Sequence, residues 1–142
     1  MREATVESAR EEFDALFQGV GKPEVFPYGS YFLSGYTNEK PLAQLRGDLA
    51  QLGLTRDPSR PETEDHVSYI FEVMRFLIAG EDAAVSNLEQ QRKFFRTHVQ
   101  SWIDLLCQAV QEQPRARLWS AIAAMTLAFI QVETQAFDLL EG

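Results

Sequence analysis

Basic residues are scarce in this sequence of 142 residues. Lysine and arginine together number 13, against 21 aspartates and glutamates, which gives a formal net charge of −8 and a pI near 4.7. Affinity for nucleic acid comes largely from lysine and arginine neutralising phosphates, and anionic membrane surfaces likewise attract basic segments. The charge balance therefore argues against a nucleic-acid or membrane-surface partner and favours basic partners.

Cysteine and long apolar runs are also scarce. The single cysteine, Cys107, has no partner for an internal disulfide, so nothing indicates a disulfide-stapled secreted domain. The charged N-terminus lacks the apolar centre of a signal peptide. The most apolar stretch, residues 118–132, is shorter than the roughly 20 residues needed to cross a bilayer. These features predict a soluble cytoplasmic protein without direct membrane insertion.

The motifs of common catalytic and metal sites are missing as well. The sequence has no glycine-rich phosphate loop, no Cys-x-x-Cys and no His-Glu-x-x-His. Its two histidines, His66 and His98, are far apart, and neither has a second ligand at helical spacing. We therefore expect no metal and no cofactor. A hydrophobic share of 45%, with 11% aromatic residues, is enough for a folded core.

Apolar residues recur at helical spacing along the chain, whereas no stretch alternates apolar and polar residues for long enough to form a strand. The pattern predicts helices over about 6–17, 42–52, 67–78, 82–97, 99–110 and 115–140, and a short helical turn in the aromatic stretch 28–36. In the helix over 82–97, Ala84, Leu88 and Phe95 should form the inner face. The whole chain, residues 1–142, is expected to be a single all-α helical bundle.

The last predicted helix is apolar on most sides between Leu118 and Val132, which is typical of a helix at the centre of a bundle. Trp119 and Phe129 should then be largely buried. The residues expected to pack against this helix are Phe71, Met74, Trp102 and Leu106.

A dense polar cluster precedes the helix over 67–78, and it consists of Glu62, Glu64, Asp65 and His66. One interpretation is electrostatic, because carboxylates in a first helical turn complement the helix dipole; Thr63 would then be the N-cap. The other makes the cluster an anionic patch beside an apolar groove. A hydrolase with His66 oriented by Asp65 or Glu64 is disfavoured, because adjacent helical residues point about 100° apart.

Three separated segments resemble the TorD family, which includes the DmsD and NarJ-type proteins. Residues 62–74, ETEDHVSYIFEVM, resemble its Glu-Pro-x-Asp-His signature, with Thr63 in place of the usual proline. Residues 94–102, FFRTHVQSW, resemble its aromatic-aromatic-x-x-His-x-x-Pro-Trp segment, with Ser101 in place of proline. Residues 13–35, FDALFQGVGKPEVFPYGSYFLSG, resemble its Leu-Phe helix end, glycine loop and Pro-Tyr turn. The three occur in the family's order.

The resemblance implies a TorD-like helical fold and a chaperone rather than an enzyme. Family members bind precursors of molybdenum-cofactor oxidoreductases in the cytoplasm and delay export until the cofactor is inserted. They recognise the twin-arginine signal peptide, the mature enzyme, or both. In the family, an Asp-His pair is implicated in recognition of the signal peptide, and the resemblance carries this role over to Asp65 and His66. PYGSYFLSG and EKPLAQLRGDL resemble members associated with formate dehydrogenase. Guanine nucleotides are connected with the family, but no phosphate-binding motif is visible. The alternative is a helical adaptor unrelated to molybdoenzymes.

The resemblance leads to two further expectations, one about the oligomeric state and one about the peptide site. The family pattern includes helices before the one that begins here near residue 5, and their absence would expose apolar surface on the last helix, so we expect a homo-oligomer. For the peptide site, Asp65 and Glu62 should hold the cationic residues, with His66 shaping the pocket and Glu64 beside it. Tyr69, Val73 and Trp102 should line an apolar groove. Asp65→Asn should then weaken peptide binding and leave folding nearly intact.

Overall fold

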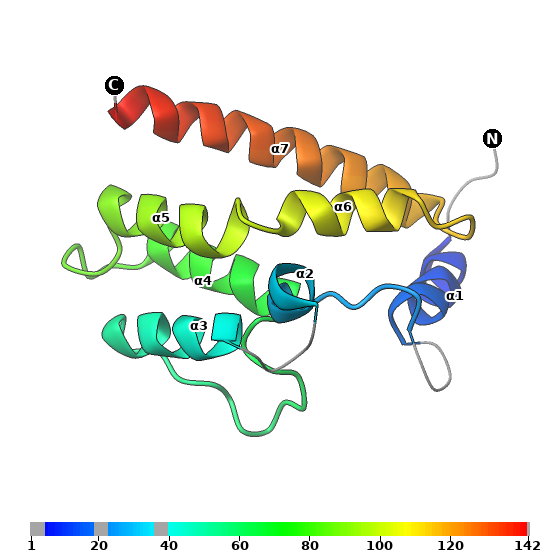
Figure 1. Cartoon of the computed structure of the whole chain (residues 1–142), viewed down its shortest axis with the longest axis horizontal. Coiled ribbons are helices and arrows are strands. Elements are labelled where there is room, and N and C mark those ends of the chain that lie inside the picture. Colours follow the sequence, from blue (N-terminus) through cyan, green and yellow to red (C-terminus); the bar gives the residue numbers. More distant parts are fainter. Residues whose placement is uncertain (1–4, 19–22, 36–39, 142) are drawn as a thin grey trace. The chain divides into compact units, whose positions relative to one another are not determined.

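The computed structural model describes residues 5–18, 23–35 and 40–141, and within these ranges the protein is all-α. One isolated bridge, between Tyr28 and His66, is the nearest approach to a sheet among the described residues. Figure 1 shows the elements in chain order: α1 (Val6–Phe17), α2 (Gly29–Ser34), α3 (Lys40–Gln51), α4 (Val67–Ala79), α5 (Leu88–Phe94), the π-helical turn η1 (Phe95–Val99), α6 (Ile103–Gln111) and α7 (Leu118–Glu141). The predicted fold class is confirmed.

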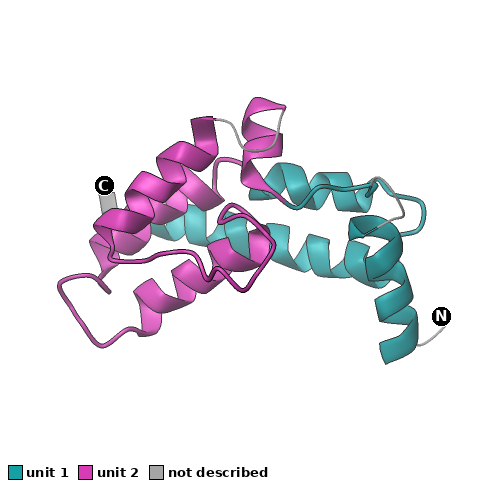
Figure 2. Ribbon diagram, turned by 90° about the horizontal axis from the view of Figure 1, so that it is seen from below, with its two compact units in different colours: residues 1–27, 103–142 teal, residues 28–102 magenta. Residues whose placement is uncertain are grey.

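The chain divides into two compact units, which Figure 2 shows in different colours. The first comprises residues 1–27 and 103–142, and the second comprises residues 28–102. No helix in the described part of the chain is both long and apolar enough to span a bilayer.

In the first unit, α6 lies alongside α7, and α1 contacts the beginning of α7. The α6 face consists of Ile103, Leu106, Cys107 and Val110, all buried. Phe13, Phe17 and Trp119 join α1 to α7, with ring centroids 5.1–5.8 Å apart. Burial raises the pKa of the Cys107 thiol to about 11, so this cysteine is a neutral core residue at physiological pH.

The N-terminus of α7 is capped by a side chain from α1. The Glu12 carboxylate accepts hydrogen bonds from the backbone N–H groups of Arg117, Leu118 and Trp119, at 2.6, 3.2 and 2.8 Å. The first N–H groups of a helix have no partners within the helix, and the helix dipole favours a negative charge there. Glu12 therefore fixes α7 to α1 although more than 100 residues separate them in sequence.

Removing this cap should destabilise the protein. Glu12→Ala is expected to lower the free energy of unfolding by about 1–2 kcal/mol, because three backbone donors lose their partner while α1 keeps a good helix former. Urea denaturation measures the change, and Glu11→Ala, an exposed neighbour on the same helix, is the matched control. Equal effects from the two variants would show that the cap contributes nothing.

The expected central position of α7 is wrong. Its buried residues are Ala123, Ile130 and Phe137, which recur every seven residues and form one stripe. Phe129, predicted to be buried, has 58% of its surface exposed, and Trp119 is only half-buried. A helix that is apolar on most sides has several faces that could be buried, but its own sequence does not show which of them other helices cover.

In the second unit, α2 packs against α3, and α4 packs against α5 and η1. The core is formed by apolar residues from these elements: Leu42, Leu45, Leu49, Ile70, Met74, Leu77, Phe94, Phe95, Val99 and Trp102. Most of these residues recur at helical spacing in the sequence. Burial of one face of each helix therefore accounts for that spacing.

Two helix boundaries differ from the prediction. The expected helix over 82–97 begins only at Leu88, because Asp82 accepts the backbone N–H of Ala84 in a turn and Asn87 caps the helix by accepting from Gln90. Ala84 and Leu88 are exposed, so they do not form an inner face. The expected helix over 99–110 begins at Ile103, after a turn that follows η1.

Candidate functional site

Asp65 is a buried structural residue of the second unit, with 3% of its surface exposed. Its Oδ2 accepts the backbone N–H of Ser30 at 2.9 Å and also the Ser30 hydroxyl, and its Oδ1 accepts the Thr63 hydroxyl at 2.6 Å. Its backbone carbonyl accepts the N–H of Gly29 at 3.0 Å. The expectation that Asp65 faces outward to hold a cation is wrong, because the start of α2 uses its carboxylate instead.

His66 is the N-cap of α4, a position that the sequence analysis assigned to Thr63. Its Nδ1 accepts the backbone N–H of Ser68 at 3.1 Å and lies 2.7 Å from the Ser68 hydroxyl. No carboxylate lies in the first turn of α4. The interpretation that carboxylates of the cluster complement the helix dipole from within this turn is therefore wrong. An Asp-His dyad is also absent, because Asp65 binds Ser30 and His66 binds Ser68.

Glu64 links the segment before α4 to α3. The Arg46 guanidinium donates to both carboxylate oxygens, with Nε–Oε2 at 2.7 Å and Nη2–Oε1 at 3.2 Å, and the Glu64 side chain is 11% exposed. Burial raises the pKa of Glu64, but hydrogen bonds and the charges of Arg46 and Arg56 together lower it more, so its net pKa lies below the ordinary value. Glu64 is therefore ionised and already paired with a cation.

Glu62 differs from these neighbours, because it has no hydrogen bond or ion pair with the residues that the structure describes. Its negative charge acts on Tyr28, His66 and Tyr69, raising the pKa of each phenol and opposing the effect of burial on the histidine. The rings of Tyr28 and Tyr69 lie 5.1 and 6.3 Å from that of His66. Glu62 is thus the carboxylate of the cluster that remains available to a cationic ligand, beside aromatic rings.

Trp102 does not line a groove. Its surface is 1% exposed, and its indole N–H donates to the backbone carbonyl of His98 at 2.6 Å. Phe32 stacks on it, and a Cβ added at Gly29 would meet its ring at 3.0 Å. The large apolar ring is the support on which α2 rests, which explains why a glycine begins that helix.

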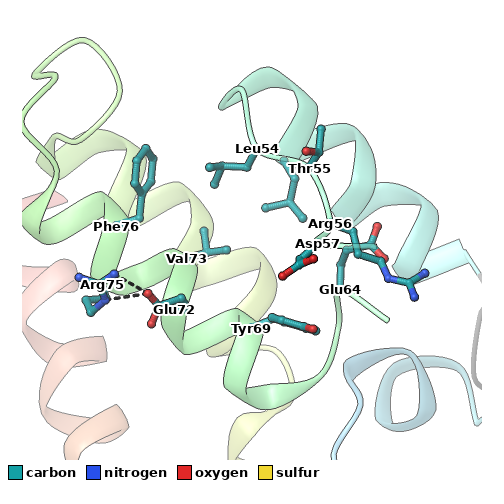
Figure 3. A pocket seen from close by; sticks show the side chains of 11 residues that line it. Leu54, Thr55, Arg56, Asp57, Glu64, Tyr69, Glu72, Val73, Arg75 and Phe76 are labelled. Carbon is teal, nitrogen blue, oxygen red and sulfur yellow. Dashed lines mark hydrogen bonds and ion pairs between the residues drawn. The ribbon is translucent and has the colours of Figure 1, made fainter. Parts of the chain in front are cut away.

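An open groove of about 300 Å³ lies beside α4, and Figure 3 shows the side chains around it. Tyr69, Val73 and Phe76 enter it from α4 at helical spacing, opposite the chain that follows α3. Leu49 and Leu54 complete an apolar floor. The polar residues around the floor are Thr55, Arg56, Asp57, Glu64, Glu72 and Arg75, of which Glu72 and Arg75 pair with each other.

The groove contains part of the predicted site. Tyr69 and Val73 line it as expected, and Glu64 lies at its edge, whereas Trp102 and Asp65 do not. The hydroxyl of Tyr69 is buried and has no hydrogen-bond partner among the described residues. Phe76 was not predicted, although the i, i+4, i+7 spacing from Tyr69 could have indicated it. The loop residues 54–57 were not predicted either, because the sequence carries no comparable pattern for them.

His98 belongs to the second family-like segment and also has a structural role. Its Nε2 lies 2.6 Å from Oδ2 of Asp48, which joins η1 to α3. Burial lowers the pKa of His98 and outweighs the opposing effect of Asp48, and burial likewise lowers the pKa of His66.

These lowered values predict a pH dependence of stability. Both histidines take up protons more readily in the unfolded chain, whose histidine pKa is about 6.5, so acidification through that range favours unfolding. The melting temperature should fall between about pH 7.5 and about pH 5.5, above the range in which most carboxylates titrate. Differential scanning calorimetry of the wild type and of the double variant His66→Gln, His98→Gln tests this. If the double variant kept the same dependence of melting temperature on pH, groups other than these two histidines would be responsible for it.

Comparison with known proteins identifies a family and relatives of this sequence. The sequence profile of a family described as "Nitrate reductase delta subunit" matches residues 1–108. A Vibrio cholerae serotype O1 protein named "Chaperone protein TorD" is 27% identical over 136 residues, covering 91% of this chain and 62% of the relative. A protein of the same name from Psychrobacter sp. is 28% identical over 134 residues, covering 89% and 61%. The chain thus spans about three fifths of these relatives. No solved structure matches it significantly.

Proposed function

Because the chain belongs to the nitrate reductase delta subunit family, we propose that it is a cytoplasmic chaperone for the maturation of a molybdenum-cofactor oxidoreductase. In this function it binds the precursor, or the twin-arginine signal peptide of that precursor, before export. The observation that carries the proposal is the similarity to proteins named as TorD chaperones over 89–91% of the chain. Formate dehydrogenase is the client that the segments PYGSYFLSG and EKPLAQLRGDL favour.

The groove beside α4 is where we place the signal peptide. Such a peptide combines two arginines with an apolar stretch, and the groove combines an apolar floor with carboxylates at its edge. Burial of apolar side chains would supply most of the binding free energy. Glu62 would meet an arginine, since it is the carboxylate of the cluster without a partner in the described structure, and the aromatic rings beside it add cation–π attraction.

The net charge of −8 supports the same arrangement. Opposite charges steer a basic peptide toward an acidic surface and raise the association rate more than the affinity. Glu64 and Glu72 are already paired with Arg46 and Arg75, so Glu62 carries the local specificity in this proposal.

Calorimetric titration with a synthetic signal peptide tests the function. The probe is the twin-arginine signal peptide of a formate dehydrogenase precursor, and the control is the same peptide with both arginines replaced by lysines. Arginine presents a planar fork of donors that lysine lacks, so the wild-type chain should bind the arginine peptide at least ten-fold more tightly. Equal affinities would favour a helical adaptor that does not recognise the motif, and no binding of either peptide would contradict signal-peptide recognition.

A further inference from the structure

The Tyr69 hydroxyl is a buried polar group whose hydrogen-bonding capacity is unused. Tyr69 extends from α4, and Figure 3 shows its ring pointing toward the chain segment that carries Glu64. Among the described residues, its oxygen is the one buried side-chain polar atom that has no hydrogen-bond partner. Leaving such a group unpaired is unfavourable, so a case in a native structure calls for an explanation.

This hydroxyl belongs to the groove beside α4. Tyr69 lines the groove together with the apolar side chains of Val73 and Phe76. The phenol ring adds apolar surface to that wall, and the hydroxyl places a hydrogen-bonding group next to it. Glu64, at the edge of the groove, is already paired with Arg46. Tyr69 therefore offers a ligand a polar contact for which no group of the described chain competes.

The loop near the hydroxyl is held by local bonds. The charged residues whose electrostatic effect reaches the Tyr69 hydroxyl are Glu62, Arg60, Asp57 and Arg56. Residues 55–61 of this loop are exposed, and within it the Arg56 guanidinium donates to the Arg60 carbonyl at 2.8 Å. A segment with exposed side chains and local hydrogen bonds opens at low free-energy cost. A ligand in the groove can therefore displace the loop and reach the hydroxyl.

The protonation state of Tyr69 decides which ligand group it can bind. Burial and the negative charge of Glu62 raise the pKa of the phenol, so the hydroxyl keeps its proton and can donate a hydrogen bond. In an apolar stretch of peptide, the polar groups are the main-chain amides. Burying a main-chain carbonyl against apolar side chains is unfavourable unless a donor meets it. A hydroxyl beside an apolar wall is such a donor.

We propose that the Tyr69 hydroxyl donates a hydrogen bond to a main-chain carbonyl in the apolar stretch of the bound signal peptide. The inference rests on the proposed function and adds to it a contact that reads the peptide backbone rather than its side chains. Glu62 then selects for an arginine of the peptide, while Tyr69 holds the apolar stretch whatever its side chains are.

Tyr69→Phe tests the proposal, because it removes the hydroxyl and keeps the ring. In calorimetric titration this variant should bind the arginine signal peptide roughly 3- to 12-fold more weakly than the wild type does, which is the range of one neutral hydrogen bond. The lysine peptide should lose affinity by the same factor, since the two peptides have the same main chain. Tyr31→Phe is the matched control: Tyr31 lies on α2 and does not line the groove, so peptide affinity should not change.

The same variant should keep its stability in the absence of peptide. Removing a buried hydroxyl that has no partner relieves an unfavourable interaction. The urea midpoint of Tyr69→Phe should therefore equal or exceed that of the wild type, although its peptide affinity falls. A lower midpoint would show that the hydroxyl already has a partner in the free chain, and it would overturn the proposal.

The titrations separate this inference from the proposed function. If the wild type bound neither peptide, the proposed function would fail and the inference with it. If the wild type bound the arginine peptide and Tyr69→Phe bound it with an affinity within about two-fold, below the effect of a hydrogen bond, the inference alone would be overturned. A loss confined to the arginine peptide would show that the hydroxyl meets an arginine side chain, which would overturn the assignment to a main-chain carbonyl.

Discussion

Replacing Asp65 by asparagine is expected to lower the free energy of unfolding by roughly 3 kcal/mol, because buried hydrogen bonds to a charged group are lost together. The Asp65 carboxylate accepts two bonds from Ser30 and one from Thr63. An asparagine has one acceptor oxygen for these donors, and its amide N–H groups would point at groups that also donate. The start of α2 would then lose its connection to α4.

Urea denaturation with Asp57→Asn as control measures this effect. Asp57 is an exposed aspartate in the same loop. Its carboxylate accepts hydrogen bonds from the backbone N–H and the hydroxyl of Ser59 and lies 4.0 Å from the Arg60 guanidinium. Its replacement should change stability by less than about 0.5 kcal/mol. If Asp65→Asn were as stable as the control and instead lost peptide affinity, the earlier expectation of an outward-facing ligand residue would stand and the structural role would be wrong.

Placing a charge on the floor of the groove is expected to abolish most of the peptide binding. In Val73→Asp, a half-buried side chain that lines the groove becomes a carboxylate. The apolar stretch of a signal peptide would lose the contribution of a buried valine, about 1.5–3 kcal/mol, and would meet a charge that must remain hydrated. Affinity should therefore fall by roughly 10- to 150-fold in a calorimetric titration.

Ile78→Asp is the matched control for this variant. Ile78 lies on the same helix with 62% of its surface exposed, and it does not line the groove. Both variants add an aspartate to α4, so differences between them report on the groove rather than on helix propensity or net charge. Equal affinity of the two variants for the peptide would place the binding site elsewhere.

Much of the fold follows from the sequence because the helices of the second unit bury one face. In the predicted helices 42–52 and 67–78, the apolar residues at helical spacing include Leu42, Leu45 and Leu49 on α3, and Ile70, Met74 and Leu77 on α4. The structure buries all six. The periodicity failed at Ala84 and Leu88, where capping by Asp82 and Asn87 sets the boundary and no core lies beneath. Local hydrogen bonds of this kind compete with an apolar pattern.

The sequence indicated three residues that line the groove, Glu64, Tyr69 and Val73, but not the roles of the others that it singled out. Residues 62–66 stand out by composition, yet Asp65 binds Ser30, which lies 35 positions earlier, and no local pattern predicts such a pair. Trp102 was assigned to a surface groove by helical spacing alone, whereas the packing of α2 buries it. Glu62 and Glu64 are near neighbours in the chain, and only the structure separates the paired carboxylate from the one without a partner in the described chain.

Under the proposed function, the signal peptide contacts the groove beside α4 rather than the Asp65–His66 pair. Asp65 and His66 then act indirectly, by holding α2 and the start of α4 in place. Substitution of either residue would then change peptide binding only by disturbing the groove through the fold.

Site-specific photo-crosslinking tests this claim most directly. Benzoylphenylalanine would replace Phe76 in the groove or, as a control, Leu105, which is exposed on α6. On irradiation with a labelled twin-arginine signal peptide, position 76 should form an adduct that excess unlabelled arginine peptide suppresses and the lysine peptide does not, and position 105 should form none. Adducts of equal yield at both positions, or equal suppression by the two peptides, would contradict the account.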